Sequence, residues 1–72
     1  MKLPQISGIE LVKRLMRFGF VVVRQRGSHI RLEKNVPSGS IKITVPAHPV
    51  LKKGTLHHII KDAGLTPEEV LF

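Results

Sequence analysis

The sequence predicts one small α+β domain, spanning residues 1–72, in which helices cover one face of a three-stranded antiparallel sheet. Two segments towards the ends of the chain have apolar residues at helical spacing, and the region between them has the alternation that is typical of strands. Short segments containing glycine separate the strands, which favours hairpins over longer crossover connections. The expected order is therefore helix, three strands, helix and a short C-terminal helical turn.

The first helix is expected to begin after Ser7 and to stop at Gly19. Ser7 and Glu10 have the spacing of a capping box, in which each side chain accepts a hydrogen bond from the other residue's backbone N–H. The apolar residues expected on its inner half are Ile9, Leu11, Val12, Leu15, Met16 and Phe18. The basic residues expected only to aid solubility are Lys13, Arg14, Arg17 and, later in the chain, Lys61.

The central region predicts three strands. Phe20–Arg24 is rich in β-branched residues and forms the first, although three consecutive valines leave its buried face open. Gly27 marks the turn into the second strand, and a loop over residues 35–39 precedes the third. The apolar residues expected to face the helices are Ile30, Leu32, Ile41, Ile43 and Val45. The polar residues that then share the open face are His29, Arg31, Lys42 and Thr44.

The C-terminal third predicts a second helix and a final turn. Leu56, Ile59, Ile60 and Ala63 have the spacing of a buried helical stripe, which Gly64 ends. The segment Thr66–Glu69 repeats the start signal, with a capping residue, a proline at the first helical position and a glutamate at the third. A helical turn is expected to follow, as far as Leu71.

The charge is the strongest indication of a partner. Twelve Lys and Arg residues against five Asp and Glu residues give a formal net charge of +7, which is typical of proteins that bind nucleic acids. An anionic membrane surface is the other partner of such a charge, but no stretch approaches the roughly 20 apolar residues of a membrane span. The absence of cysteine excludes disulfides and thiolate metal sites. A cytoplasmic protein without a membrane partner is expected.

The residues best suited to catalysis or phosphate binding are concentrated in the segment Arg24–Leu32. His29 can give and take protons near neutral pH, as histidines in general do. The arginines around it have the guanidinium groups that grip phosphate in a bidentate manner. This combination suits cleavage of an RNA backbone, but it also suits a binding surface without chemistry, or a solvated strand.

An ordered set of short motifs resembles the HicA toxin family. The segments that carry the resemblance are Leu3-Pro4, Ser7-Gly8, Arg24–His29, Val45–His48, Lys53–Leu56, Ile59-Ile60 and Ala63–Leu65. The resemblance covers nearly the whole chain, and its most specific element is the Gly-Ser-His sequence that ends at His29. The sequence departs from the family pattern at Pro49–Leu51 and at the His57-His58 pair, neither of which involves His29.

The resemblance implies a fold like that of double-stranded-RNA-binding domains and the activity of a translation-independent mRNA interferase. Such a protein is the toxin of a type II toxin–antitoxin system, and its partner is a HicB-type antitoxin that covers the active face. The family's catalytic histidine falls on His29. The substrate would be mRNA or another single-stranded or structured RNA, and neither a cofactor nor a metal is expected.

Three functions remain open on the sequence: a metal-independent endoribonuclease, a non-catalytic binder of double-stranded or structured RNA, and an interaction protein that docks through its open face. The residues expected to bind RNA are Arg24, Arg26, Ser28, Arg31, Lys42, Lys52 and Lys53. His48 is expected either to order its loop or to act as a second proton carrier. His57 and His58 lie about 100° apart on a helix, which does not make a metal pair, and His58 is expected to be solvated.

Overall fold

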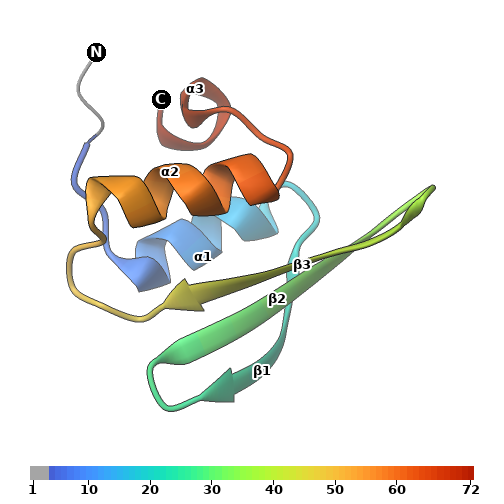
Figure 1. Ribbon diagram of the computed structural model, residues 1–72, viewed down its shortest axis with the longest axis horizontal. Helices are drawn as coiled ribbons and strands as arrows, with labels where there is room; N and C mark the ends of the chain where they lie inside the picture. The colour runs from blue at the N-terminus through green and yellow to red at the C-terminus, as the bar shows by residue number, and fades with distance from the viewer. Residues whose placement is uncertain (1–3) are drawn as a thin grey trace.

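The computed structural model describes residues 4–72, and its order of elements is the predicted one (Figure 1). Leu3, part of one motif above, lies outside the described residues. The elements are α1 (Gly8–Met16), β1 (Val21–Arg26), β2 (His29–Val36), β3 (Gly39–Pro46), α2 (Lys53–Asp62) and α3 (Pro67–Leu71). The antiparallel sheet has the order β1-β2-β3, and the helices lie on the β3 side of it, with β1 farthest away. None of the helices in the described part of the chain is long and apolar enough to cross a bilayer.

The hydrophobic core lies between the helices and the inner faces of β2 and β3. The alternation predicted for these strands is confirmed, because Ile30, Leu32, Ile43 and Val45 are all buried. The core residues contributed by the helices are Leu11, Val12, Leu15, Leu56, Ile59, Ile60, Ala63, Val70 and Leu71. The open face of the sheet is therefore left to the polar residues of the same two strands.

Two features of α1 differ from the expectation. Ile9 and Met16 were predicted to be buried, but they are 47% and 50% exposed. The buried residues of α1 recur at the spacing i, i+3, i+4 and i+7, because β3 and α3 cover one stripe of this helix rather than one half. Phe18, predicted with the same group, is half-buried against the edge of the core.

Strand β1 buries none of its six residues. Val21, Val22 and Val23 are 56%, 44% and 49% exposed, so neither face of the strand belongs to the core. The register with β2 shifts between Val22 and Arg24, so that Val23 forms a bulge. β1 is thus an edge strand that extends beyond the helical layer (Figure 1).

The second hairpin is tighter than the sequence suggested. Asn35 pairs with Ser40, and Val36 pairs with Gly39, so the predicted loop over residues 35–39 shrinks to two residues. Polar residues with a turn preference can still pair at the end of a hairpin, where both faces are solvated. In the first hairpin, Gly27 has a φ of +58°, as the first position of a two-residue turn requires.

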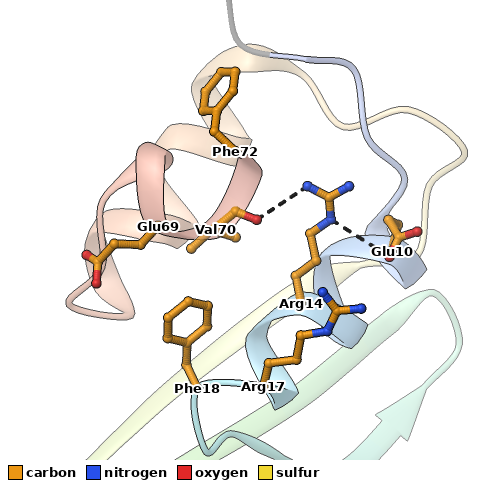
Figure 2. A pocket seen from close by; sticks show the side chains of 7 residues that line it. All are labelled: Glu10, Arg14, Arg17, Phe18, Glu69, Val70 and Phe72. Atoms are coloured by element: carbon orange, nitrogen blue, oxygen red, sulfur yellow. Dashed lines mark hydrogen bonds and ion pairs between the residues drawn. The ribbon is translucent and has the colours of Figure 1, made fainter.

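The helix starts follow their capping signals only in part. Ser7 Oγ accepts a hydrogen bond from the Glu10 N–H at 3.0 Å, but the Glu10 carboxylate lies 3.9 Å from Arg14 Nε, along its own helix. Thr66 and Glu69 form the complete box. Arg14, expected only to aid solubility, donates from Nη1 to the carbonyl of Val70 at 3.3 Å (Figure 2). Arg14 therefore connects α1 to the C-terminal end of α3.

Backbone hydrogen bonds hold the connection between β3 and α2 against two other parts of the chain. The Gly8 N–H donates to the His48 carbonyl at 3.0 Å, and the Leu51 N–H donates to the Ile6 carbonyl at 2.9 Å. The Ala47 N–H donates to the carbonyl of Ser28 at 2.6 Å, next to the start of β2. The connection is thus bound both to the beginning of α1 and to the first hairpin.

Glycine is required at position 8 because of this packing. A Cβ atom built on Gly8 would lie 1.9 Å from the Pro46 carbonyl oxygen, which is backbone and cannot move aside alone. We predict that Gly8→Ala lowers the free energy of unfolding by about 1–3 kcal/mol, the usual range for overpacking. Gly54, near the start of α2, is a matched control because its Cβ would meet open space. Gly54→Ala should raise the free energy of unfolding by about 0.5–1 kcal/mol.

Urea denaturation of the two variants checks this prediction. Equal stability of Gly8→Ala and wild type would mean that the start of α1 does not pack closely on the end of β3.

Candidate functional site

His29 is the first residue of β2 and follows directly after the two-residue turn. It pairs in register with Arg26 on β1 and with Pro46 on β3. Its neighbour Ile30 is buried, so the alternation of the strand places His29 on the open face, where it is exposed. The predicted position of this histidine, outside the helical layer, is thus confirmed.

Two shallow hollows meet at His29 and Thr44. The smaller has a volume of about 140 Å³ and is lined by Arg24, Arg26, His29, Arg31 and Thr44. The larger has a volume of about 500 Å³ and is lined by His29, Thr44, Pro46, Gly54, Thr55, His58 and Ile59. His29 therefore stands between an arginine-rich hollow on the sheet and a hollow whose other wall is helix α2.

The arginines of the smaller hollow are not neutralised by the protein. Arg24 and Arg31 face each other in register across β1 and β2, an arrangement of like charges that destabilises a sheet. Within residues 4–72, the carboxylates that lie beside a basic side chain are Glu10, next to Arg14, and Asp62, next to His58, and neither pair involves this hollow. The local excess of positive charge can attract an anion such as a phosphate.

The start of α2 contributes to the larger hollow. Gly54 and Thr55 belong to its first turn and line the hollow. Its N-cap residue, Lys52, makes no side-chain capping bond, and the first turn, which is fully within the described chain, contains no acidic residue. The positive end of this helix dipole therefore remains uncompensated beside Thr55.

The structure brings together four of the residues predicted for the site. Arg24, Arg26, Arg31 and His29 line one hollow. His29 and Arg31 were predicted to share a face, whereas the orientation of the first strand, which contributes Arg24 and Arg26, was left open. Lys42 lies farther from His29. It pairs with Glu33, whereas His29 pairs with Pro46, four residues further along β3. At the usual rise per residue, Lys42 and Pro46 are about 13 Å apart along the strand.

The other residues predicted for the site line neither hollow. Lys52 and Lys53 are exposed at the start of α2, next to the larger hollow but not among its lining residues. Ser28 holds the connection through its backbone carbonyl. His48 is exposed, lines neither hollow and accepts a hydrogen bond from Gly8 through its carbonyl, which fits the ordering role weighed for it above.

Three lining residues with polar side chains, Thr44, Thr55 and His58, were missing from the predicted site. Thr44 had been placed on the open face, and the alternation of β3 could have added it. Thr55 and His58 come from α2, and nothing local in the sequence indicates that this helix reaches the open face. His58 was expected to be merely solvated; its side chain is exposed, but it lines the larger hollow, and its Nε2 lies 3.2 Å from Asp62 Oδ2.

A further hollow, of about 400 Å³, lies between α1 and α3 (Figure 2). Its lining residues are Glu10, Arg14, Arg17, Phe18, Glu69, Val70 and Phe72. Arg14 is already bound to α3 and to Glu10, and two carboxylates offset the two arginines. The hollow has no histidine to move a proton, so it is a weaker candidate than the site around His29. No cluster of three or more metal-ligating His, Asp or Glu side chains occurs in the described residues.

The repulsion between Arg24 and Arg31 has a measurable consequence. We predict that Arg24→Gln raises the free energy of unfolding by about 0.2–1 kcal/mol at low ionic strength, because it removes one of two directly opposed charges. The gain should shrink in 1 M salt, where the screening length falls to about 3 Å. Arg26→Gln is the control, since its partner across the strands is His29 rather than a second arginine. A loss of stability in Arg24→Gln, measured by thermal unfolding, would contradict the proposed repulsion.

Comparisons with known proteins show the family of the chain. A search of curated proteins finds no match. The family model described as "HicA toxin of bacterial toxin-antitoxin" matches residues 8–65. The match runs from the first residue of α1 to just beyond α2, and so includes both hollows around His29. Because it covers well over half of the chain, this protein belongs to the HicA toxin family and is the toxin of a toxin–antitoxin pair.

Proposed function

We propose that this HicA toxin is an endoribonuclease that cleaves mRNA, or other single-stranded or structured RNA, with His29 as its catalytic residue. The observation that carries the proposal is the position of His29, exposed at the junction of an arginine-lined hollow and a hollow bordered by the start of a helix. A proton carrier lies there beside cations that no carboxylate of residues 4–72 neutralises. RNA supplies both the phosphate and a neighbouring nucleophile.

The reaction uses the 2′-hydroxyl of the substrate as its nucleophile. This oxygen attacks the adjacent phosphorus, the bond to the 5′-oxygen breaks, and the products carry a 2′,3′-cyclic phosphate and a 5′-hydroxyl. His29 either removes the proton of the 2′-hydroxyl or protonates the departing 5′-oxygen, and such a transfer typically contributes about 10²–10⁴-fold. Arg24, Arg26 and Arg31 stabilise the negative charge that grows on the phosphate oxygens. This chemistry needs no metal.

The site is better suited to binding backbone than to reading bases. No Phe side chain of residues 4–72 lines either hollow beside His29, and the chain has no Tyr or Trp, so a large platform on which bases could stack is missing there. We therefore propose weak sequence preference, with the choice of RNA governed by accessibility of the backbone in the cytoplasm.

The antitoxin partner is proposed to be of the HicB type and to cover the open face of the sheet. The three unneutralised arginines make this face attractive to acidic side chains as well as to phosphate. A partner bound there would exclude RNA from His29 directly.

The alternative is an RNA-binding module without catalysis. The arginines and the start of α2 would support binding whether or not His29 transfers a proton. The two functions share one face, so they differ in the fate of the RNA and not in its position.

Substitution of His29 separates these alternatives. We predict that His29→Ala reduces the rate of RNA cleavage by about 10²–10⁴-fold while RNA binding is retained, because the arginines remain. His57→Ala is the matched control: it removes another exposed histidine, one that lines neither hollow. The measurement is single-turnover cleavage of a labelled RNA, in EDTA, with a 2′-deoxy substitution at the cut site as a second control.

Cleavage by wild type that survives EDTA and fails on the 2′-deoxy substrate supports the proposed reaction. Full activity of His29→Ala would exclude His29 as the catalytic residue, and the absence of any cleavage by wild type would favour the binding module.

Salt dependence tests the role of the arginines. Contacts from three arginines to three phosphates of single-stranded RNA give a slope of about −2 in a plot of log affinity against log salt concentration. We predict that Arg31→Gln reduces the magnitude of this slope by about 0.7, whereas Arg17→Gln, on the α1–α3 side, leaves it unchanged. An equal change in both variants would indicate that RNA binding is not confined to the open face.

A further inference from the structure

We propose that His58, oriented by Asp62, is the second proton-transfer residue of RNA cleavage and acts together with His29. This inference rests on the proposed ribonuclease function and extends it. It starts from a chemical requirement: one proton must leave the 2′-oxygen and another must reach the 5′-oxygen. A single imidazole cannot do both at the same instant, so a partner for His29 accelerates the reaction.

His29 and His58 both line the larger hollow. His29 enters its lining from β2, and His58 enters it from α2, with Thr44 and Thr55 also in the wall. Its volume of about 500 Å³ lies in the range of small-ligand sites, roughly 300–1,000 Å³. A phosphodiester placed at the junction of the two hollows would have the arginines on one side and His58 on the other.

The other two histidines do not share this position. His57 precedes His58 on α2 and is turned about 100° around the helix, and it is not part of the lining. His48 is exposed on the connection between β3 and α2 and is also outside the lining. All four histidines lie in the described residues, and His58 is the one that shares a hollow with His29.

Asp62 gives His58 the orientation that a proton donor needs. The carboxylate Oδ2 lies 3.2 Å from His58 Nε2, one helical turn away, and so leaves Nδ1 as the nitrogen available to a substrate. A carboxylate at this distance can hold an imidazole in place, as in other sites where an acidic group orients a histidine.

The neighbours of the two histidines differ. Asp62, on α2 itself, lies 3.2 Å from His58, while Thr44 and Pro46 on the opposing strand carry no charge. Arg24, Arg26 and Arg31 border His29 from the adjoining hollow. We assign the general acid to His58, whose neighbour is a carboxylate, and the general base to His29, whose neighbours are guanidinium groups.

The step is balanced in atoms and protons. His29 removes the proton of the 2′-hydroxyl as this oxygen bonds to phosphorus, and the P–O5′ bond breaks. His58 gives its proton to the departing 5′-oxygen, which leaves as a 5′-hydroxyl. Exchange with solvent then returns both histidines to their starting states.

The test compares wild type, residues 1–72, with His58→Gln, Asp62→Asn and the matched control His57→Gln, using cleavage of a short RNA from pH 5 to pH 9. Wild type should show a bell-shaped pH profile, because the reaction requires one neutral and one protonated imidazole. In His58→Gln, kcat should be about 10²–10⁴-fold lower than in wild type, and the rate should no longer decline on the alkaline side of the profile. Asp62→Asn should lose less, and His57→Gln should match wild type.

A substrate with sulfur in place of the 5′-oxygen distinguishes an acid from a structural residue. A thiolate leaves without being protonated, so this substrate should restore the rate of His58→Gln to near that of wild type but should not rescue His29→Ala. Because the side chain of His58 is 75% exposed, its replacement does not disturb the core.

The outcomes separate the two proposals. Absence of cleavage by wild type overturns the ribonuclease itself. An active wild type with an unchanged His58→Gln profile, or with a His58→Gln defect that the sulfur substrate does not repair, overturns the role of His58 and leaves that of His29 in place.

Discussion

The close packing of the start of α1 on the end of β3 is the constraint on which the site depends. Gly8 has no side chain, so the helix can approach the Pro46 carbonyl, and its N–H binds the connection that follows. The same connection is bound to Ser28, immediately before His29. Helix α2 leaves from this anchored segment, and its first turns consequently border the open face beside His29. One backbone arrangement thus determines both walls of the larger hollow.

Part of the positive charge of the protein does not stabilise its fold. Arg14 is the counterexample: it binds Glu10 and the carbonyls at the end of α3, and so contributes to the packing of the helices. Arg24 and Arg31 face each other without a carboxylate within reach among residues 4–72, and α2 begins with lysines instead of acidic residues. These arrangements are unfavourable for folding, and they converge on the open face. An anionic partner that binds there would relieve them.

The sequence predicts the part of this structure that is encoded locally. Alternation in β2 and β3 correctly separates the core from the open face, and the position of His29 follows from it. The sequence does not predict how much of each apolar face the neighbouring elements cover. Ile9 and the valines of β1 are apolar but exposed. Periodicity indicates which residues share a face, but it does not indicate how far the next layer extends over that face. His58 was missed for the same reason. Its place in the hollow depends on where α2 lies relative to the sheet, which is a property of the anchored connection.

We propose that RNA binds the open face at the junction of the two hollows. The most direct measurement is an NMR titration of the full chain with an oligonucleotide whose 2′-hydroxyl groups are replaced by hydrogen, which can bind but not react. We expect the largest amide shifts at the start of β2, the end of β3 and the first two turns of α2. Shifts concentrated instead around Arg14, Phe18 and Phe72, in the hollow between α1 and α3, would contradict it.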